Sequence, residues 1–489
     1  MNHRMILSLL GYVLLLIGAF LLLPCVIALI YGERELTAFL IAAGISAGSG
    51  LLLCLLRPRK NRSMQARDGF VMVSLSWILI SLVGALPFYF SGHIPSYLDA
   101  VFEVVSGFTT TGASILPNVS VLSHCELFWR SFTHWLGGMG VLVFMLAVVP
   151  MSGESIYLLR AESPGPSVSK MVPKMRSSAM ILYVIYIVMT VIQILFYQVG
   201  RLFGWGNMAL FDSLCLSFGT AGTGGFAILP DGLAGYSMYE QAVTTVFMIL
   251  FGVNFSIYFF ILCRKFRLVW QNSELKCCIG VILAAIALIT VNLVLRGGYF
   301  RSVGETVHHV SFAVGSVITT TGYSTVDFSQ WPEFSRVILM CLMVIGACAG
   351  STGGGMKVSR ILILAKSARA EVRRLLHPHA VEVMSMDGKR VDRAVIHGTS
   401  AFLIWYIVIL ILSVAIISLD NFGTETTLTA VLATLNNIGP GTSAIIGPVG
   451  SFAGFSNLSK VVMIADMLFG RLEIFPMLLL LRPSTWVKH

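Results

Sequence analysis

Long apolar runs constrain this chain more than any other feature of its sequence. The first run covers residues 5–30. It is longer than the about 18 residues that a membrane-spanning helix needs, and longer than the apolar core of a secretory signal, which has about 7–15 residues. Of all 489 residues, 56% are hydrophobic and only 11% are charged, whereas a soluble domain carries about 25% charged residues. The sequence therefore predicts an all-α protein that crosses a membrane many times.

We predict ten spanning helices, of which the first two form a separate N-terminal unit, 1–67. The other eight form four pairs, which divide the chain into units 68–177, 178–270, 271–393 and 394–489. The predicted spans are 5–30 and 36–56, followed by the pairs 70–90 with 127–149, 179–199 with 239–263, 277–295 with 334–364, and 395–418 with 458–481.

Lys and Arg are distributed unevenly over the predicted loops. If the N-terminus is cytoplasmic, 25 of the 33 basic residues fall on cytoplasmic segments, nine of them in 357–393. This is the positive-inside bias of membrane proteins, so both termini should be cytoplasmic. The basic loop 357–393 could be a solvated face or a docking site for a partner. No basic stretch carries interleaved aromatic residues, so nucleic acid is not expected as a partner.

Motifs of other protein classes are missing from the sequence. The nine cysteines include no CxxC pair, so neither a disulfide framework nor a zinc site is expected. No HExxH or paired intramembrane aspartate motif occurs, so a membrane-embedded enzyme is only a remote alternative. No organic cofactor is predicted.

The loop between the helices of each pair follows one repeated pattern. The four segments are YLDAVFEVVSGFTTTGAS (97–114), LFDSLCLSFGTAGTGGFA (210–227), VHHVSFAVGSVITTTGYS (307–324) and TLTAVLATLNNIGPGTS (427–443). Each begins with an apolar stretch too short to span a bilayer and ends in small polar residues. Alignment places Gly112, Gly225, Gly322 and Gly439 in one column, which predicts four pseudo-symmetric helix–pore loop–helix repeats.

This repetition carries the chemical argument. Irregular backbone at membrane depth is tolerated only where it lines water or is buried in protein. Four re-entrant loops around one axis could direct carbonyl oxygens inward and replace the water shell of an alkali cation. Asp99 and Asp212, 13 residues before their filter glycines, would be helix N-caps on the simpler interpretation; alternatively, they attract cations to the mouth.

At these motifs the sequence resembles the Trk/Ktr/HKT superfamily of potassium transporters, within it the TrkH branch. The resemblance rests on SGFTTTGAS (106–114), GTGGFA (222–227), TTTGYST (319–325), LNNIGPG (435–441), WRSFTHWLGGMG (129–140), GACAGSTGGGMKVSR (346–360) and MLFGRLEIFPML (467–478). It implies ion sites, mostly backbone carbonyls, at Thr110, Thr111, Gly112, Thr223, Gly224, Gly225, Thr320, Thr321, Gly322, Asn437, Ile438 and Gly439. The second and fourth filters depart from TTTG, so the pore is only pseudo-symmetric.

The resemblance also implies the biological setting. It implies a potassium pore in each subunit, a homodimer, a cytoplasmic nucleotide-binding partner of the TrkA type, and residence among the lipids of the bacterial inner membrane. K⁺ would be the transported ion. A glycine at all four filter positions is similar to potassium-selective members of the superfamily, so Gly112→Ser or Gly322→Ser should weaken potassium preference without unfolding the protein.

The predicted eighth span is interrupted by GACAGSTGGGMK (346–357). Five glycines and a lysine cannot continue a lipid-facing helix, and the segment resembles an intramembrane gating loop. The alternative is a helix that ends early at the cytoplasmic surface. The gate residues expected from the resemblance are Gly346, Gly350, Ser351, Thr352, Gly353, Gly354, Gly355, Lys357 and Arg471.

Three polar residues within the spans need an explanation. Arg471 is expected to face the cavity beneath the filter, or alternatively to pair with Asp466 or Glu473. Arg130 is predicted to be a structural anchor at the outer end of its span, and Asn254 to form an interhelical hydrogen bond.

Two transport mechanisms remain open. The first is channel-like potassium uptake down the electrochemical gradient, and the second is symport of potassium with a proton or sodium. Few charged residues lie deep in the spans, which favours the channel-like mechanism. Dependence of the reversal potential on external pH would indicate coupling.

Overall fold

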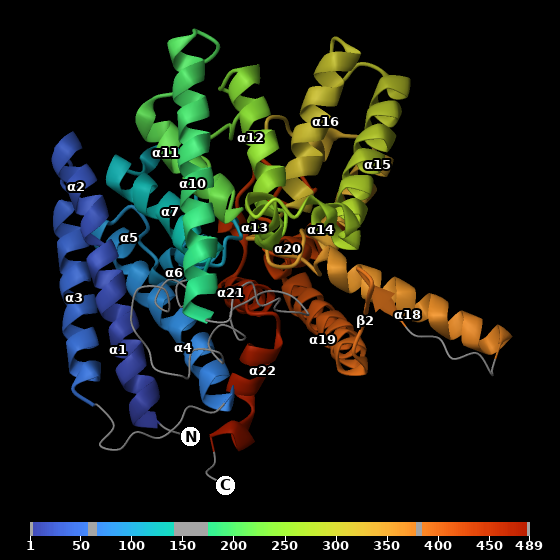
Figure 1. The fold of residues 1–489 in the computed structure, drawn as a ribbon. Coiled ribbons are helices and arrows are strands. Elements are labelled where there is room, and N and C mark those ends of the chain that lie inside the picture. Colours follow the sequence, from blue (N-terminus) through green and yellow to red (C-terminus); the bar gives the residue numbers. More distant parts are fainter. Residues whose placement is uncertain (1–2, 57–65, 141–174, 378–383, 487–489) are drawn as a thin grey trace.

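The computed structural model describes residues 3–56, 66–140, 175–377 and 384–486, and the regular structure in these parts is helical except for one small hairpin (Figure 1). The hairpin pairs β1 (Ser385–Met386) with β2 (Lys389–Arg390) in antiparallel register. Both termini lie at the same end of the molecule, as the prediction of an even number of crossings requires. The predicted all-α polytopic fold is confirmed.

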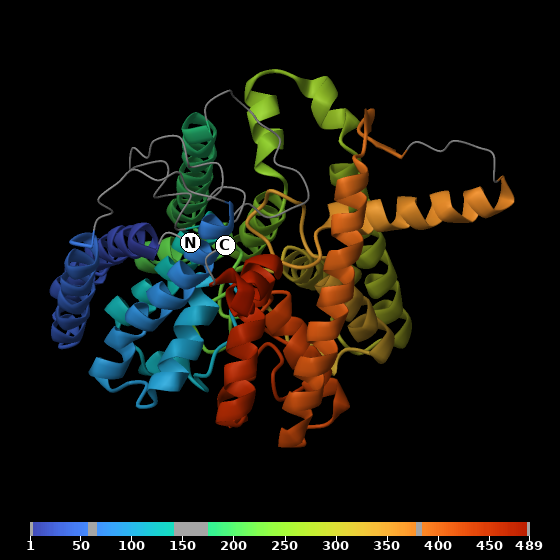
Figure 2. The same ribbon diagram turned by 90° about the horizontal axis from the view of Figure 1, so that it is seen from below.

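The N-terminal unit is a helical hairpin at the edge of the molecule (Figure 2). It consists of α1 (His3–Phe20), α2 (Leu22–Tyr31) and α3 (Leu36–Cys54). An ideal Cβ placed on Gly11 of α1 would lie 2.7 Å from the carbonyl oxygen of Gly50 on α3. Small residues allow this close packing of helix backbones, which supplies van der Waals contact where lipid offers no hydrophobic driving force.

Within the described residues, six segments are long and apolar enough to cross a membrane by themselves. They are 3–31 (α1 with α2), Leu36–Cys54 (α3), 67–91, Ala179–Leu202, Ser273–Arg296 and 393–420. The last four contain α4 (Ala66–Gly84) with α5 (Leu86–Ser91), α10 (Met175–Leu202), α15 (Ser273–Arg296), and α19 (Arg393–Ile417) with η3 (Ser418–Asp420). These segments match the two N-terminal spans and the first span of each predicted pair.

In three of the four pairs the second helix is interrupted within the described residues, so the predicted spans 239–263 and 458–481 are not continuous. The interrupted helices are α12 (Met238–Phe251) with α13 (Phe255–Leu262), α17 (Glu333–Ile345) with α18 (Val358–Leu376), and α21 (Asn457–Arg471) with α22 (Phe475–Leu481); the second helix of the first pair begins as α7 (His124–Gly138). The axes of α12 and α13 differ by 90°. Only the break at 346–357 was predicted; positions 141–149 of the predicted span 127–149 lie outside the described residues.

Glycines that pack against other helix ends account for the unpredicted breaks. A Cβ on Gly470 would lie 2.1 Å from the carbonyl oxygen of Leu435, and one on Gly252 would lie 2.6 Å from Cγ2 of Thr319. Both contacts join residues far apart in sequence. The apolar pattern of the two spans therefore gave no sign of the breaks.

Four short helices, one between the two helices of each pair, point toward the centre of the molecule. They are α6 (Tyr97–Phe108), α11 (Leu210–Gly222), α16 (Val303–Ile318) and α20 (Thr424–Leu435); the remaining short elements are α14 (Phe266–Gln271), η1 (Val119–Val121), η2 (Phe328–Gln330), η4 (Phe452–Gly454) and η5 (Pro483–Thr485). None of the four short helices is long enough to span a bilayer.

Two predictions about polar residues in these elements are wrong. The N-caps of α6 and α11 are Ser96 and Ala209, so Asp99 and Asp212 lie inside the first turn, where a carboxylate favours the helix dipole. Asp99 pairs with Lys460 at 2.7 Å, and Asp212 accepts from the Tyr236 hydroxyl.

The prediction for Asn254 concerned a bond between helices. Its side chain instead accepts a hydrogen bond from the Ser256 amide and so caps the N-terminus of its own helix, α13.

The loop after α2 caps α7 from a distance. Glu33 accepts hydrogen bonds from the backbone amides of His124 at 2.6 Å and Cys125 at 2.9 Å, which are the first two amides of α7. Burial raises the pKa of Glu33, but the hydrogen bonds from Cys125 and His124 outweigh it and leave the pKa below its ordinary value. The ionised carboxylate thus stabilises the helix N-terminus.

We expect Glu33→Gln to lower the thermal stability of the protein at pH 7, by about 1 kcal/mol. Because the folded pKa is depressed, this stabilisation is present above the unfolded pKa of about 4.3 and is lost as pH falls through the folded pKa. The difference between variant and wild type should therefore shrink below about pH 4. Glu35→Gln, in the same loop, is the control; equal losses in both variants at pH 7 would contradict the capping role.

Candidate ion-conducting site

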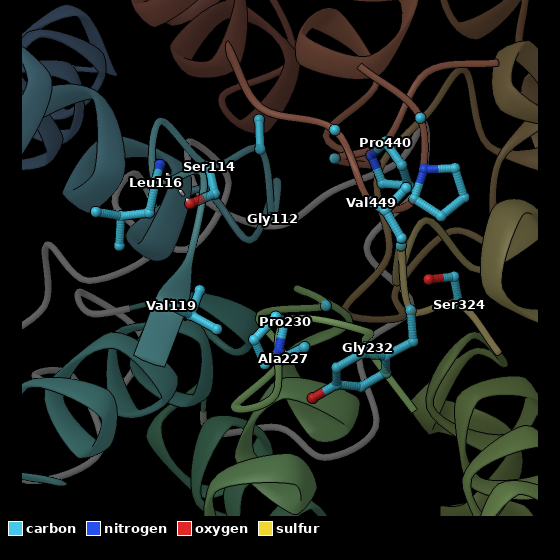
Figure 3. A pocket seen from close by; sticks show the side chains of 18 of the residues that line it. Gly112, Ser114, Leu116, Val119, Ala227, Pro230, Gly232, Ser324, Pro440 and Val449 are labelled. Carbon is cyan, nitrogen blue, oxygen red and sulfur yellow. Dashed lines mark hydrogen bonds between the residues drawn. The ribbon is translucent and has the colours of Figure 1, made fainter. Parts of the chain in front are cut away.

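The four predicted filter segments meet at one place. Gly112, Gly225, Gly322 and Gly439 all line a single cavity of about 90 Å³. Figure 3 shows segments from all four loops around this opening, marked by Gly112, Ala227, Ser324 and Pro440. The residues are far apart in sequence but line one cavity, which is consistent with the prediction of four loops around one axis.

The contacts among the four glycines close a ring. An ideal Cβ built on each glycine would strike the backbone carbonyl oxygen of the residue just before the next filter glycine. The distances are 2.1 Å from Gly112 to Gly224, 1.9 Å from Gly225 to Thr321, 2.0 Å from Gly322 to Ile438, and 2.8 Å from Gly439 to Thr111. Each loop is thus packed directly against the backbone of the next, and the fourth returns to the first.

The same backbone hydrogen bond ends all four short helices. In each, the amide one residue before the filter glycine donates to the carbonyl five residues earlier. The bonds are Thr111 to Ser106 (2.9 Å), Gly224 to Gly219, Thr321 to Ser316 and Ile438 to Ala433 (each 2.8 Å). The four loops therefore leave their helices in one conformation, although their sequences differ.

The backbone angles repeat as well. The residue two before each filter glycine has a positive φ: Thr110 55°, Thr223 54°, Thr320 57° and Asn437 54°. The filter glycines themselves have φ between 81° and 100°, except Gly225 at 76°. Left-handed geometry at every second residue turns successive carbonyls to the same side, and a non-glycine residue there is uncommon. Such strain persists only where the surrounding structure imposes it.

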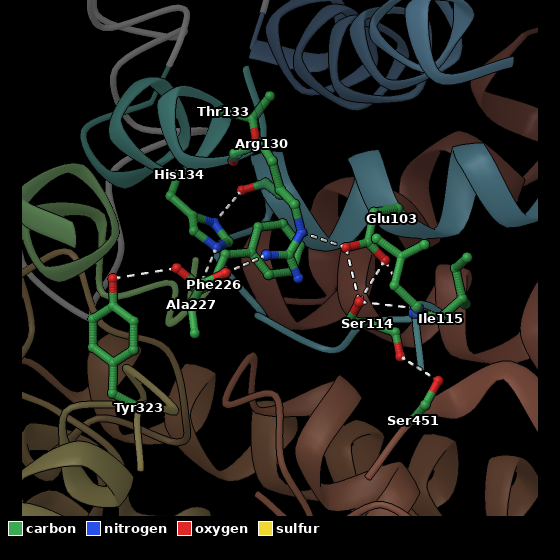
Figure 4. Close-up of polar contacts among 12 residues, drawn as sticks. Glu103, Ser114, Ile115, Arg130, Thr133, His134, Phe226, Ala227, Tyr323 and Ser451 are labelled. Carbon is green, nitrogen blue, oxygen red and sulfur yellow. Dashed lines mark hydrogen bonds and ion pairs between the residues drawn. The ribbon is translucent and has the colours of Figure 1, made fainter. Parts of the chain in front are cut away.

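A buried ion pair supports the outer side of the ring (Figure 4). Arg130 Nε lies 2.6 Å from Glu103 Oε1, and Arg130 Nη1 donates to the carbonyl of Ala227 at 2.9 Å. The Glu103 carboxylate also accepts from the Ser114 hydroxyl and the Ile115 amide. Arg130 thus joins the first loop to the second, in agreement with its predicted role as an anchor. Loss of one partner of a buried pair typically costs about 3–5 kcal/mol.

His134 is a residue of this support that the sequence did not reveal. The Phe226 amide donates to its Nε2 at 3.2 Å, and its Nδ1 lies 2.7 Å from the Gly107 carbonyl. Nε2 must therefore be the acceptor and Nδ1 the donor, which describes a neutral ring. The imidazole bridges α6 and the second loop, and its partners are too distant in sequence to be predicted.

The segment 346–357 lies directly beneath the ring. The Gly354 amide donates to the Thr320 hydroxyl at 2.6 Å, and the Gly355 amide donates to the Asn436 carbonyl at 3.1 Å. Thr352 is fully buried. The alternative of a helix that ends early at the surface is therefore wrong. The gate residues expected in this segment are buried or partly buried in one stretch: Gly346, Gly350, Ser351, Thr352, Gly353, Gly354, Gly355 and Lys357.

Contacts from other elements hold both ends of this segment. Glu274, at the start of α15, accepts from the Ala349 amide at 2.6 Å and from the Ser359 amide at 3.1 Å. The Cys348 amide donates to the Gly252 carbonyl within the break between α12 and α13, and Lys357 Nζ donates to the Gly353 carbonyl. Sequence reasoning missed Glu274, whose only signal was an acid at a predicted helix start.

Arg471 lies between this segment and the first filter loop. Its guanidinium donates to the Thr110 hydroxyl at 3.1 Å, the Thr352 carbonyl at 2.9 Å and the Gly138 carbonyl at 2.7 Å. The proposed partners of the alternative interpretation are engaged elsewhere, since Glu473 pairs with Arg360 and Asp466 accepts from Ser413. Arg471 therefore carries a positive charge directly below the ring.

Comparisons with known proteins agree with this arrangement. Residues 37–488 match the model of the TrkH family, described as cation transport proteins. The chain is 35% identical to the Trk system potassium uptake protein TrkH of Salmonella typhimurium and 34% identical to that of Escherichia coli, over 99% of this chain and all of each relative. It is also similar to the crystal structure of the potassium transporter TrkH from Vibrio parahaemolyticus, with a TM-score of 0.88, 30% identity and full coverage of both chains.

We expect Gly112→Ala to destabilise the protein much more than Gly92→Ala. The two glycines have nearly equal φ, 81° and 82°, but a Cβ on Gly92 meets nothing within 4 Å. Left-handed strain should cost each variant about 1–2 kcal/mol, and the collision with the Gly224 carbonyl should add about 1–3 kcal/mol at Gly112. Thermal unfolding in detergent measures both. Equal shifts would mean that the ring contact is not rigid.

Proposed function

We propose, from the premise that this chain belongs to the TrkH family of cation transport proteins, that it is a potassium uptake protein of the Trk system. It resides in a bacterial inner membrane with both termini in the cytoplasm. The distribution of Lys and Arg over the predicted loops supports this orientation. The names of the similar proteins identify potassium as the transported ion. The geometry of the filter loops supports a path for that ion through the protein.

Potassium crosses the protein through the ring of filter loops. The observation that carries this proposal is the closed cycle of glycine-to-carbonyl contacts around one cavity. Carbonyl oxygens held at fixed separation can replace the hydration shell of a bare monovalent ion. The C-terminal ends of α6, α11, α16 and α20 run into the ring, and their partial negative charge favours a cation there. The candidate ion-binding residues are the twelve named from the sequence.

Segment 346–357 acts as the gate. It is bonded to the inner ends of the third and fourth loops through Thr320 and Asn436, so an ion leaving the ring would meet it. Arg471 bonds to the same segment at Thr352 and adds a positive charge on the path. Displacement of the segment would break these bonds together and open the passage.

Conduction is channel-like and controlled from the cytoplasm. In the last repeat the buried Asp466 accepts from Ser413 and the partly buried Glu473 pairs with Arg360, so these two described acids do not form a chain of carboxylates for a proton. The active form is a homodimer, and a cytoplasmic nucleotide-binding subunit of the TrkA type controls the gate. The word "system" in the names of the similar proteins supports a second component.

The selectivity test is cation flux in reconstituted vesicles with potassium, rubidium and sodium. Gly322→Ser places a Cβ 2.0 Å from the Ile438 carbonyl, so that oxygen must move away from its position in the ring. We expect the potassium-to-sodium preference to fall about tenfold, which corresponds to about 1.4 kcal/mol.

Gly423→Ser is the matched control for this experiment. Its φ of 88° is close to the 86° of Gly322, and no atom lies within 4 Å of its added Cβ. It should fold less stably but keep its selectivity. Unchanged selectivity in Gly322→Ser would overturn the filter assignment.

The gate test is Arg471→Gln, measured as potassium flux without any partner protein. The variant loses charged hydrogen bonds to the segment and to repeat one, each worth about 1.5–3 kcal/mol. We expect flux to rise at least about tenfold, because a 1.4 kcal/mol change shifts the open population by that factor. Arg336→Gln removes an ion pair of 2.6 Å with Glu425 at the end of α17 opposite to segment 346–357 and should leave flux unchanged. Flux equal to wild type in Arg471→Gln would contradict the gating role.

A further inference from the structure

Helix α18 leaves the body of the protein. It begins at Val358, one residue after Lys357 of the segment beneath the filter, and Val358 is buried. From Glu371 to Leu376 every residue is exposed, with Val372 57% and Leu375 77% accessible. Figures 1 and 2 show the helix projecting sideways, across the direction of α19. No described part of the chain covers this outer half.

The outer half of α18 has two distinct faces. Leu364, Ala368, Val372 and Leu375 are spaced four, four and three residues apart and therefore share one face of the helix. Lys366, Arg369 and Arg373 are spaced three and four residues apart and share another face. With Arg374, the outer half carries four basic residues and one acid, Glu371. Glu371 follows Leu364 by seven residues and precedes Leu375 by four, so it lies on the face of the apolar stripe; its exposed pair with Arg374, at 3.3 Å, contributes little.

The contacts of Lys366 fix the orientation of these faces. Its Nζ donates to the Ser385 carbonyl at 2.8 Å, so the basic face is turned toward the β1–β2 hairpin. The hairpin leads directly into Arg393, the first residue of the membrane-crossing helix α19, and so lies at the membrane surface. The apolar stripe is therefore turned away from the hairpin.

We propose that α18 lies in the cytoplasmic interface of the bilayer and that its basic face binds the phosphate headgroups of anionic phospholipids. An apolar stripe beside an Arg- and Lys-rich face is the pattern of helices that lie in the membrane plane. The cytoplasmic leaflet carries negative charge that attracts such clusters. Because α18 continues from Lys357, the bound headgroups would also hold the inner end of segment 346–357.

Hydrogen exchange of the full-length protein in nanodiscs tests this. The amides of 366–376 should exchange about tenfold more slowly in discs that contain phosphatidylglycerol than in pure phosphatidylcholine. The triple variant Arg369→Gln, Arg373→Gln, Arg374→Gln should lose this difference, and it should retain less phosphatidylglycerol by native mass spectrometry. Soluble glycerol phosphate should not reproduce the protection.

A charge-matched variant controls for a general effect of basic residues. Arg4→Gln, Arg393→Gln and Arg482→Gln remove three exposed arginines from other elements and should leave the protection of α18 unchanged. Protection of equal size in both lipids would overturn the proposal. Protection that follows protein concentration instead of lipid charge would assign the stripe to a second copy, and protection that needs an added cytoplasmic protein would assign it to that partner; either result also overturns it.

Discussion

The contact between each filter glycine and the backbone carbonyl of the next loop governs the rest of the structure. Three of the four positions leave less than 2.2 Å for a Cβ, so the loops can approach this closely only without side chains. A ring of this kind fixes the oxygen positions in all four loops together, since a shift in one displaces its neighbour. The Arg130–Glu103 pair and His134 make sense as supports for this spacing, because they join the first loop to the second from outside the ring.

The breaks in the second helices arise from the same constraint. A helix that packs beneath the ring must bring its backbone close to the ends of the short helices, and Gly470 against Leu435 and Gly252 against Thr319 show how close. The backbone groups freed at the breaks do not face lipid: the Gly252 carbonyl accepts from Cys348, and the Phe255 amide donates to Gly350. Irregular backbone at membrane depth is thereby satisfied within the protein.

The sequence predicted those features whose signal is local. The length of the apolar runs predicted the six segments that can cross a membrane unbroken. The column of repeated glycines predicted residues that line one cavity. Sequence reasoning failed where the cause lies elsewhere in the chain. The spans 239–263 and 458–481 read as continuous because nothing near Gly252 or Gly470 shows what packs against them. Glu274 and His134 could not be identified either, since an isolated acid or imidazole gains its meaning only from partners on other elements.

The segment beneath the filter belongs to only one repeat, yet it is bonded to all four. It reaches Thr320 in its own loop, Asn436 in the fourth, Gly252 in the second and, through Arg471, Thr110 in the first. The amides of Ala349 and Ser359 both donate to the carboxylate of Glu274. The two parts of the chain that contain these amides therefore cannot separate without leaving the buried carboxylate without a hydrogen-bond donor. A segment held at so many points does not yield gradually. As the gate that we propose, it moves between discrete arrangements, because a packed interior is bistable and resists continuous deformation.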